Sequence, residues 1–214
     1  MDTAVAVVPE TADLDGLRAA AAGCRACELW KPATQTVFGE GPVDARVVLV
    51  GEQPGDVEDR RGLPFVGPAG KLLDRALAEA GIDRDISYVT NAVKHFGFRL
   101  SGKRRIHQTP GAEHIAACRP WLDAELALIS PEVVVCLGAT AAKALLGPSF
   151  RITRQRGQLM PYDPPTAEED AAVKSAWIMA TTHPSAVLRV PDESRAEAYD
   201  ALVADLRVAA GALA

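Results

Sequence analysis

The sequence lacks any apolar run of the ~18–20 residues that a membrane-spanning helix needs. Its first residues, Met1-Asp2-Thr3-Ala4, lack the basic start of a secretory signal. No internal repeat, low-complexity segment or interdomain linker is visible in the 214 residues, of which 48% are hydrophobic, enough for a sizeable core. We therefore expect one cytoplasmic domain over residues 1–214, with no membrane partner.

The chain also lacks an overall excess of positive charge, since its net charge is −5. This excludes a globally basic DNA-coating protein, but affinity for phosphate depends on local charge. Five Lys or Arg and no Asp or Glu lie between Lys94 and His107, and three of these cations stand next to His107 in the run Lys103-Arg104-Arg105-Ile106-His107. Such a run is most often a solvated surface loop. The histidine beside it favours a site for a polyanion, where an imidazole can act as a nucleophile or carry a proton.

Cysteine is scarce, and four cysteines in a cytoplasmic chain do not form a disulfide framework. Cys24 and Cys27 form a C-x-x-C pair, and Cys118 and Cys136 form a second, wider pair. Four thiolates suit zinc or an iron–sulfur cluster. Cys136, however, lies in an apolar run that is typical of a buried strand, where cysteine is often only a small apolar side chain. The residues themselves leave both interpretations open.

Short β-branched runs alternate with helical patterns along the chain. This alternation predicts a parallel sheet with helices on both faces, an α/β fold. We expect strands at 46–51, 87–93, 132–137 and 176–181, and helices at 11–23, 68–80, 111–129, 139–146 and 192–212. We further expect a hairpin at 151–162, a basic loop at 96–110 and an exposed loop at 161–170.

Polar residues directly follow three of these strands. Glu52 and Gln53 lie in Gly51-Glu52-Gln53-Pro54-Gly55, Asn91 ends the second strand, and His183 begins His183-Pro184-Ser185. Because the carboxyl ends of parallel strands meet at one edge of a sheet, we expect these groups to converge there. The glycine-rich turn lacks the G-K-[ST] ending of a P-loop, which argues against nucleoside triphosphate binding.

Three of these residue types suit recognition of a base, although each has a simpler explanation. Phe65 is either a core residue or a stacking platform. Asn91 either satisfies backbone groups or pairs with the polar edge of a pyrimidine. His183 either belongs to a turn or donates a hydrogen bond to a carbonyl oxygen that gains negative charge.

Together these segments resemble the uracil-DNA glycosylase superfamily. The resemblance rests on Gly51–Gly55, Pro64-Phe65-Val66-Gly67, Thr90-Asn91, Lys103–His107 and His183-Pro184-Ser185. It is to the iron–sulfur, family-4 branch and, within it, most closely to the UdgX type. Gln53 and the Lys103–His107 run are the two features that separate this type from ordinary family-4 enzymes.

The resemblance implies a three-layer α/β/α fold around a four-stranded parallel sheet, and a structural [4Fe–4S] cluster on Cys24, Cys27, Cys118 and Cys136. It implies uracil-containing DNA, single- or double-stranded, as substrate, and free uracil as product. The implied uracil-binding residues are Gly51, Gln53, Phe65, Asn91 and His183. Lys103, Arg104 and Arg105 would hold DNA phosphates.

The implied catalytic residues are His107, Glu52 and His183. His183 would stabilise the departing uracil anion, Glu52 would act near the sugar, and His107 would bond covalently to the anomeric carbon after uracil leaves. The expected protein is thus a monomeric uracil-DNA glycosylase that traps itself on its product. One alternative is a turnover glycosylase in which water captures the sugar cation and the basic run only clamps DNA. The other is an iron–sulfur or zinc nucleic-acid-binding module without activity.

Overall fold

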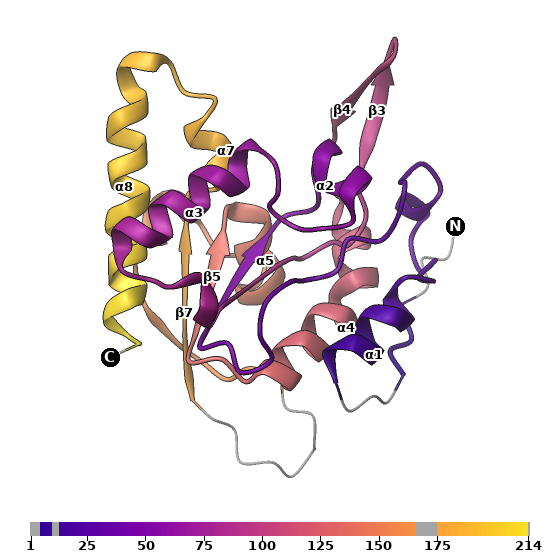
Figure 1. Ribbon diagram of the computed structural model, residues 1–214, viewed down its shortest axis with the longest axis horizontal. Helices are drawn as coiled ribbons and strands as arrows, with labels where there is room; N and C mark the ends of the chain where they lie inside the picture. Colours follow the sequence, from indigo (N-terminus) through magenta and orange to yellow (C-terminus); the bar gives the residue numbers. More distant parts are fainter. Residues whose placement is uncertain (1–4, 10–12, 166–174, 214) are drawn as a thin grey trace.

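The computed structural model describes residues 5–9, 13–165 and 175–213, and its helices and strands are arranged in three layers (Figure 1). The central sheet contains β1 (Val47–Gly51), β2 (Ser87–Asn91), β5 (Val133–Leu137), β6 (Met160–Tyr162) and β7 (Ala176–Thr181). Its two faces are covered by α1 (Leu14–Ala21), α3 (Pro68–Ala80), α4 (Ala112–Ile129), α5 (Ala139–Leu146) and α8 (Asp192–Gly211). Shorter elements are η1 (Glu28–Trp30), α2 (Asp56–Arg61), η2 (Arg84–Ile86), β3 (Phe98–Ser101), β4 (Arg104–His107), α6 (Ile152–Gln155) and α7 (Pro184–Val187).

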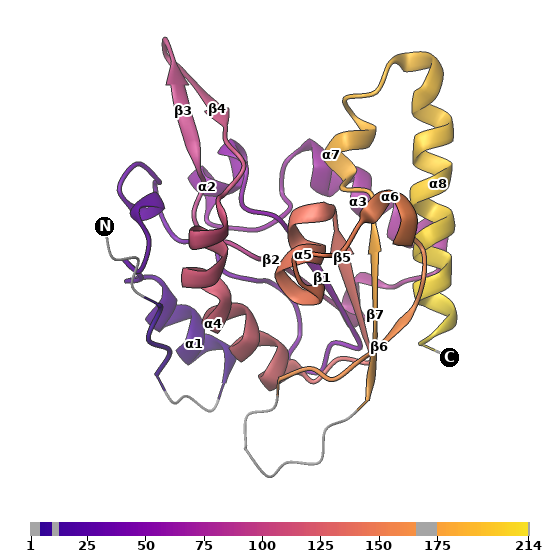
Figure 2. The same cartoon turned by 180° about the vertical axis from the view of Figure 1, so that it is seen from behind.

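Each face of the sheet packs against its own set of helices. On one face, Leu49 and Val135 pack with the apolar sides of α3 and α8. On the other face, Val50 and Val134 pack with α4 and α5, and Figure 2 shows these two helices from behind. Because both faces are covered, β1, β2 and β5 are buried along their whole length, which explains why β1 and β5 are apolar runs rather than alternating patterns, while β2 also buries the polar residues Ser87, Thr90 and Asn91. The predicted three-layer α/β/α fold is confirmed.

The sheet has one strand more than the four expected. Its order is β2-β1-β5-β7-β6, in which the first four strands are parallel and β6 pairs antiparallel with β7 at one edge. The prediction of a hairpin over 151–162 was therefore wrong: Ile152–Gln155 is a helical turn, and β6 pairs with a strand that follows it in sequence. β6 also occupies the start of the expected 161–170 loop, while residues 166–170 lie outside the described part of the chain, as does Thr11, the expected start of the first helix.

The expected basic loop is instead a β-hairpin. β3 and β4 form a separate two-stranded antiparallel sheet, with Phe98 opposite His107 and Ser101 opposite Arg104. Gly102 has φ +60 in the tight turn between them, a backbone angle that favours glycine. The hairpin projects from the body of the protein (Figures 1 and 2). His107 is therefore held by a paired strand rather than by an irregular loop.

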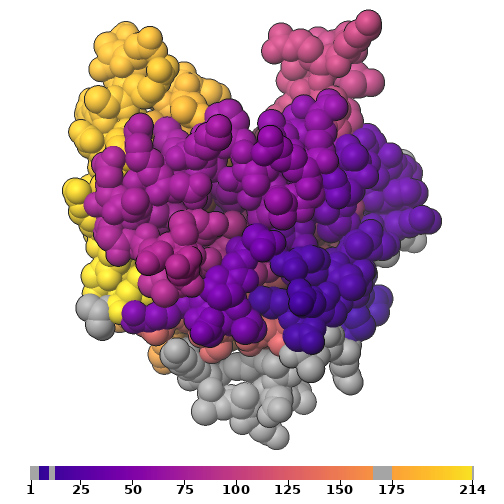
Figure 3. Space-filling model, in the orientation of Figure 1, coloured from indigo at the N-terminus to yellow at the C-terminus, as the bar shows by residue number. Residues whose placement is uncertain are grey.

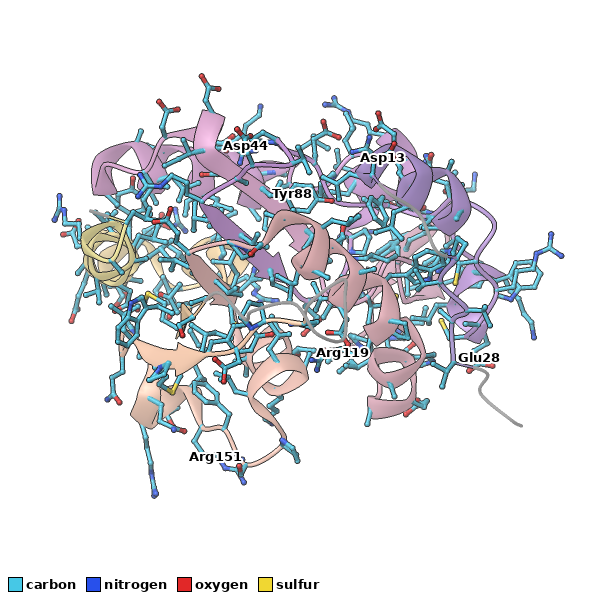
Figure 4. The ribbon with its side chains drawn as sticks, turned by 90° about the horizontal axis from the view of Figure 1, so that it is seen from below. Asp13, Glu28, Asp44, Tyr88, Arg119 and Arg151 are labelled. Atoms are coloured by element: carbon cyan, nitrogen blue, oxygen red, sulfur yellow. The ribbon has the colours of Figure 1, made fainter. Side chains whose placement is uncertain are left out.

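The amino-terminal end of the sheet is tightly packed. Figure 4 looks from that end and shows Tyr88 among packed side chains, whereas Arg151 lies at the periphery. The Tyr88 hydroxyl donates to buried Glu125 Oε1 at 2.9 Å. Burial and the Glu125 carboxylate raise the pKa of Tyr88 far above its ordinary value. In the described part of the chain, no helix is long and apolar enough to cross a membrane.

Candidate active site

A cavity of about 810 Å³ opens at the carboxyl edge of the parallel strands. Its volume lies within the ~300–1,000 Å³ of typical ligand pockets. Two walls rise beside it, the β3–β4 hairpin and the connection from α7 to α8, and the space-filling view shows the hollow between them (Figure 3). The predicted residues that line it are Glu52, Gln53, Phe65, Asn91, His107 and His183. The expected convergence of strand ends thus occurs.

Gly51 allows two of these side chains to meet. A Cβ atom at this position would lie 2.3 Å from Asn91 Oδ1 and 2.7 Å from Phe65 Cζ, distances that no real Cβ tolerates. Gly51 therefore has no side chain to offer a ligand, and its role is to leave the room that Asn91 and Phe65 occupy.

Phe65 is held in a strained conformation at the pocket wall. Its φ of 54° is unusual for a bulky residue, and such strain is concentrated at functional sites. Gly70 makes this conformation possible, because a Cβ there would stand 1.6 Å from the Phe65 carbonyl oxygen. The Phe65 ring lies in a stacked orientation with the His183 ring, their centroids 6.1 Å apart. An aromatic face is therefore fixed at the cavity wall.

Asn91 offers an unused amide to the cavity. The residue is only 2% exposed, and its side chain makes no hydrogen bond within the described residues. Its backbone carbonyl accepts a hydrogen bond of 2.8 Å from Lys94 Nζ. The amide is not among the described side-chain groups that are sealed from solvent without a partner, so it is open to the cavity, where its donor and acceptor suit a polar ligand.

His183 is oriented by its own turn. Its Nδ1 accepts the backbone N–H of Ser185 at 3.1 Å and lies 2.8 Å from the Ser185 hydroxyl. A neutral ring that accepts at Nδ1 carries its proton on Nε2, so that it has one N–H to donate elsewhere. Burial is the main cause that lowers the pKa of His183 to about 4, although Glu52 opposes it. His183 is thus a neutral hydrogen-bond donor at neutral pH.

Glu52 links His107 to the body of the protein. Its Oε1 lies 3.2 Å from Nε2 of His107, and its Oε2 accepts a hydrogen bond from the Thr140 hydroxyl. Burial on its own would raise the pKa of Glu52, but hydrogen bonds from His107 and Thr140 together bring it below the ordinary value. Glu52 is therefore ionised at neutral pH and able to accept a proton from the imidazole.

Gln53 lines the cavity, and its side-chain amide is hydrogen-bonded to the base of the hairpin. Its Nε2 donates to the carbonyl oxygens of Gly97 at 3.0 Å and Gln108 at 3.2 Å, while its Oε1 accepts the Gly97 N–H at 3.2 Å. Gly97 and Gln108 are the residues just outside the two hairpin strands. The amide predicted to bind uracil is thus occupied in holding the two ends of the hairpin together.

Arg105 has partners within the protein that the sequence did not predict. It was predicted to hold DNA phosphate, but its side chain is only 12% exposed and its guanidinium pairs with Asp56 and, at 2.6 Å, with Asp59. The guanidinium also lies 4.9 Å from the centre of the Phe98 ring. These contacts fix the hairpin to α2 and leave no free charge for a phosphate. Lys103 and Arg104 fit the prediction better, because both are exposed and make no ion pair within the described residues.

The structure groups three of the four predicted cluster cysteines. Burial is the main cause that raises the pKa of Cys118 to about 12, and the neighbouring Cys24 and Cys27 thiols contribute to the shift. The Trp121 indole N–H donates to Cys24 Sγ and the Lys94 backbone N–H to Cys118 Sγ, both at 3.2 Å.

Cys136 is not part of this group. It is fully buried in β5, paired with Val50 and Ala180 and packed among aliphatic side chains. In the described residues, no three His, Cys, Asp or Glu side chains are arranged to hold a metal ion. Three thiols with N–H donors directed at them suit a cluster, but the expected set of four ligands is not assembled.

Sequence reasoning missed two groups that support the site. Thr140 follows the strand β5 at the same sheet edge as Glu52, so the rule that placed His183 there would also have placed Thr140. Lys94 is 1% exposed, and its ammonium group pairs with fully buried Glu125 at 2.5 Å. The same group donates a hydrogen bond to the backbone carbonyl of Asn91. In sequence, Lys94 was indistinguishable from the exposed cations that follow it.

The chain is similar in sequence to known glycosylases. The sequence model of the uracil DNA glycosylase superfamily matches residues 38–207. A type-4 uracil-DNA glycosylase of Thermotoga maritima is 40% identical over 167 residues, 78% of this chain and 78% of that protein. Two others, from Sulfurisphaera tokodaii and Pyrobaculum aerophilum, are each 35% identical, covering 84% of this chain and 77% and 86% of their own lengths.

Proposed function

Because the chain belongs to the uracil-DNA glycosylase superfamily, we propose that it excises uracil from DNA and then bonds through His107 to the abasic sugar. Type-4 uracil-DNA glycosylases among its relatives support the first part. The observation that carries the second part is the contact between His107 and the ionised Glu52 at the rim of a cavity lined by Phe65 and Asn91.

Base recognition is assigned to the cavity wall. An extruded uracil would stack on the fixed Phe65 ring, and its polar edge would pair with the free amide of Asn91. Selectivity follows, because a base with the wrong donor pattern would leave the buried Asn91 amide unpaired. Gly51 contributes only space, and Gln53 contributes through the hairpin.

Departure of uracil breaks the C1′–N1 bond, and both electrons leave with the base. The Nε2–H of neutral His183 would donate to a uracil carbonyl oxygen as negative charge builds there. One preorganised donor of this kind contributes ~3–4 kcal/mol to the transition state. Since His183 carries no charge of its own at neutral pH, it adds no positive charge beside the sugar cation.

Capture of the sugar follows from the His107–Glu52 pair. With Glu52 ionised, their hydrogen bond puts a proton on Nε2 of His107 and leaves a lone pair on the other ring nitrogen. A ring nitrogen bonds to C1′, Glu52 takes up the proton that the imidazole then loses, and uracil ultimately acquires one proton. The product is a neutral alkylated imidazole on DNA plus free uracil, with no added reactant.

The hairpin keeps this nucleophile in place ahead of water. Gln53 holds the two ends of the hairpin together, and Arg105 attaches the hairpin to α2. His107 therefore approaches a bound sugar in a restricted geometry. Positioned groups of this kind have high effective concentrations relative to solvent. Lys103 and Arg104 remain for DNA phosphates. Cys24, Cys27 and Cys118 would hold an iron–sulfur cluster that clamps the α1–η1 loop to α4, and a role for Cys136 as the fourth ligand needs its own test.

The test is to mix the protein with a labelled uracil-containing oligonucleotide, measure released uracil, and denature in hot SDS. We expect one uracil released per protein and a shifted band that requires uracil. His107→Ala should abolish the band, whereas His114→Ala, which changes a histidine outside the cavity, should retain it.

Other results would select an alternative. Many uracils released per protein without a shifted band would mean that water captures the sugar and that the hairpin only clamps DNA. Binding of DNA with neither uracil release nor a band would indicate a non-catalytic module. An adduct formed by His107→Ala would show that another residue is the nucleophile.

A further inference from the structure

Lys94 is a buried cation next to Asn91, the residue whose amide faces the cavity. The side chain of Lys94 is 1% exposed, and its ammonium has three acceptors. They are Glu125 Oε2 at 2.5 Å, Thr90 Oγ1 at 2.7 Å and the Asn91 backbone carbonyl oxygen at 2.8 Å. Because an ammonium has three N–H donors, all of them are used. The group is therefore fixed in position by hydrogen bonds inside the protein.

Glu125 holds this ammonium from the helix α4. Its carboxylate is fully buried and also accepts hydrogen bonds from the Tyr88 hydroxyl at 2.9 Å and the Gly39 N–H at 3.1 Å. Figure 4 shows Tyr88 among packed side chains. The carboxylate is thus held by the core rather than by the cavity wall, and Lys94 connects the Asn91 backbone to this fixed point.

The backbone at Asn91 supports two parts of the site. Asn91 ends β2 opposite Gly51, and its side-chain Oδ1 occupies the space that a Cβ at Gly51 would need. The N–H of Ala92 donates to the Gly51 carbonyl oxygen at 2.8 Å. The N–H of Val93 donates to the Glu52 carbonyl oxygen at 3.0 Å. The ammonium bond to the Asn91 carbonyl oxygen therefore restrains the point from which the amide projects into the cavity.

Stability alone does not explain the Lys94–Glu125 pair. A buried ion pair is a weak source of stability, because apolar residues of similar volume are often equally stable in its place. The pair does supply a strong bond to one backbone carbonyl, since hydrogen bonds from an ionised donor are about twice as strong as neutral ones. A displacement of ~1 Å in a positioned group can cost ~100-fold in rate. A bond that restrains Asn91 therefore affects how well its amide meets a ligand.

We propose that Lys94 is a positioning residue for uracil recognition: its ammonium, held by Glu125, fixes the Asn91 backbone and with it the direction of the Asn91 amide. The proposal rests on the proposed function, in which that amide pairs with the polar edge of uracil. Lys94 lies outside the residues that line the cavity, so it acts through Asn91 and does not touch the base. Uracil release should depend on Lys94 only while the Asn91 amide is present.

The experiment is a double-mutant cycle between Lys94 and Asn91. Lys94→Met/Glu125→Gln, the pair variant, removes both charges, and the amide oxygen introduced at position 125 can still accept from Tyr88 and Gly39. The pair variant, Asn91→Ala and their combination are compared with the wild type. Single-turnover uracil release from a single-stranded oligonucleotide is measured with protein in excess. Urea unfolding gives the stability of each protein.

Two further variants separate positioning from a loss of stability. Arg119→Met/Asp123→Asn removes another ion pair of α4, at 2.6 Å, whose residues do not line the cavity. Lys94→Gln is a milder change, because it keeps an N–H donor for Glu125 on a side chain that is shorter by one bond. It is taken through the same cycle with Asn91→Ala. All assays contain sucrose, which favours the folded state.

We expect the pair variant to release uracil roughly 10-fold or more slowly than the wild type, and Asn91→Ala to be slower still. The combined variant should be no slower than Asn91→Ala, because Lys94 has nothing left to position once the amide is gone. Lys94→Gln should show the same pattern with a smaller loss. Arg119→Met/Asp123→Asn should match the wild-type rate.

Three results would overturn the inference while leaving the proposed function intact. One is a folded pair variant, or a folded Lys94→Gln protein, that releases uracil at the wild-type rate. Another is an equal fold-loss with and without the Asn91 amide, which would show that Lys94 supports the core in general. Failure of both Lys94 variants to fold in sucrose would show the same. If the wild type itself released no uracil, the proposed function would fail first, and the inference with it.

Discussion

Arg105→Met should detach the hairpin that carries His107 while leaving the base pocket in place. The guanidinium is the hairpin's charged connection to α2, where it meets Asp56 and the fully buried Asp59. Methionine retains an apolar side chain for the Phe98 ring but cannot neutralise either carboxylate. The expected consequence is a hairpin that opens locally and a nucleophile that is no longer held against the sugar.

The size of the stability loss depends on which hydrogen-bond partners Asp59 loses and which it keeps. Removing one partner of a buried ion pair costs ~3–5 kcal/mol. Asp59 retains hydrogen bonds from Thr34, at 2.9 Å from the backbone N–H and 2.5 Å from the hydroxyl, and half-exposed Asp56 retains Arg60. We therefore expect the lower end, about 3 kcal/mol, which corresponds to a change of roughly 100-fold in the ratio of closed to open hairpin.

Two assays separate the local effect from a global one. Urea unfolding gives the loss of stability, and hydrogen exchange of the hairpin amides reports its local opening. Single-turnover mixing with uracil-containing DNA gives the rates of uracil release and of adduct formation. Adduct formation should fall much more than uracil release, because Phe65, Asn91 and His183 lie on other elements.

Arg104→Met is the matched control. It changes the adjacent arginine, which is exposed and faces away from α2, so that stability should change by less than ~0.5 kcal/mol while DNA binding becomes less sensitive to salt. If Arg105→Met matched Arg104→Met in stability, hairpin exchange and adduct rate, the ion pairs with Asp56 and Asp59 would not be what holds the hairpin.

Three further predictions concern the site and the cysteines. Glu52→Gln should slow adduct formation ~100-fold or more, because the amide cannot take up the proton that the imidazole loses; single-turnover adduct rates at neutral pH measure this, and an unchanged rate would contradict the proton-accepting role of Glu52. The pKa of His183, about 4 when folded, lies below its ordinary value, so the unfolded state binds more protons between about pH 4 and 6.5 and stability falls as pH drops. Urea unfolding should show that His183→Asn loses about 2 kcal/mol less stability than the wild type from pH 7 to pH 5, while buried His95, whose pKa is also lowered, contributes to the loss in both proteins. Cys118→Ala should lose iron and visible absorbance, whereas Cys136→Ala should keep both; loss of iron in Cys136→Ala would restore it as a ligand.

Much of the fold and part of the site were predictable because their signals are local. The bounds of α3, α5 and β7 agree with expectation, because α3 and α5 each end before a glycine and β7 ends where its apolar run ends. The sheet-edge rule brought Glu52, Asn91 and His183 together, because the direction of a parallel strand fixes which end its last residue occupies.

The sequence could not show contacts that depend on a partner far away in the chain. Arg105 was indistinguishable from Arg104 in sequence, yet it pairs with carboxylates 46 and 49 positions away. Gln53 lines the pocket as predicted, but the sequence did not show that its amide has partners 44 and 55 positions away at the hairpin base. Cys136 was predicted as a cluster ligand and lies in the core of the sheet, away from the other three cysteines, so that its ligand role stays a prediction.

The sequence by itself determined the α/β class, the strand ends that build the pocket, and the residue types that suit uracil and an abasic sugar, since periodicity and turn chemistry are properties of neighbouring residues. Only the tertiary structure decided that the basic run is a hairpin, that Arg105 holds it and Arg104 does not, and that His107 meets Glu52. Those outcomes depend on which side chains become buried together, and burial is decided by the packing of the whole chain.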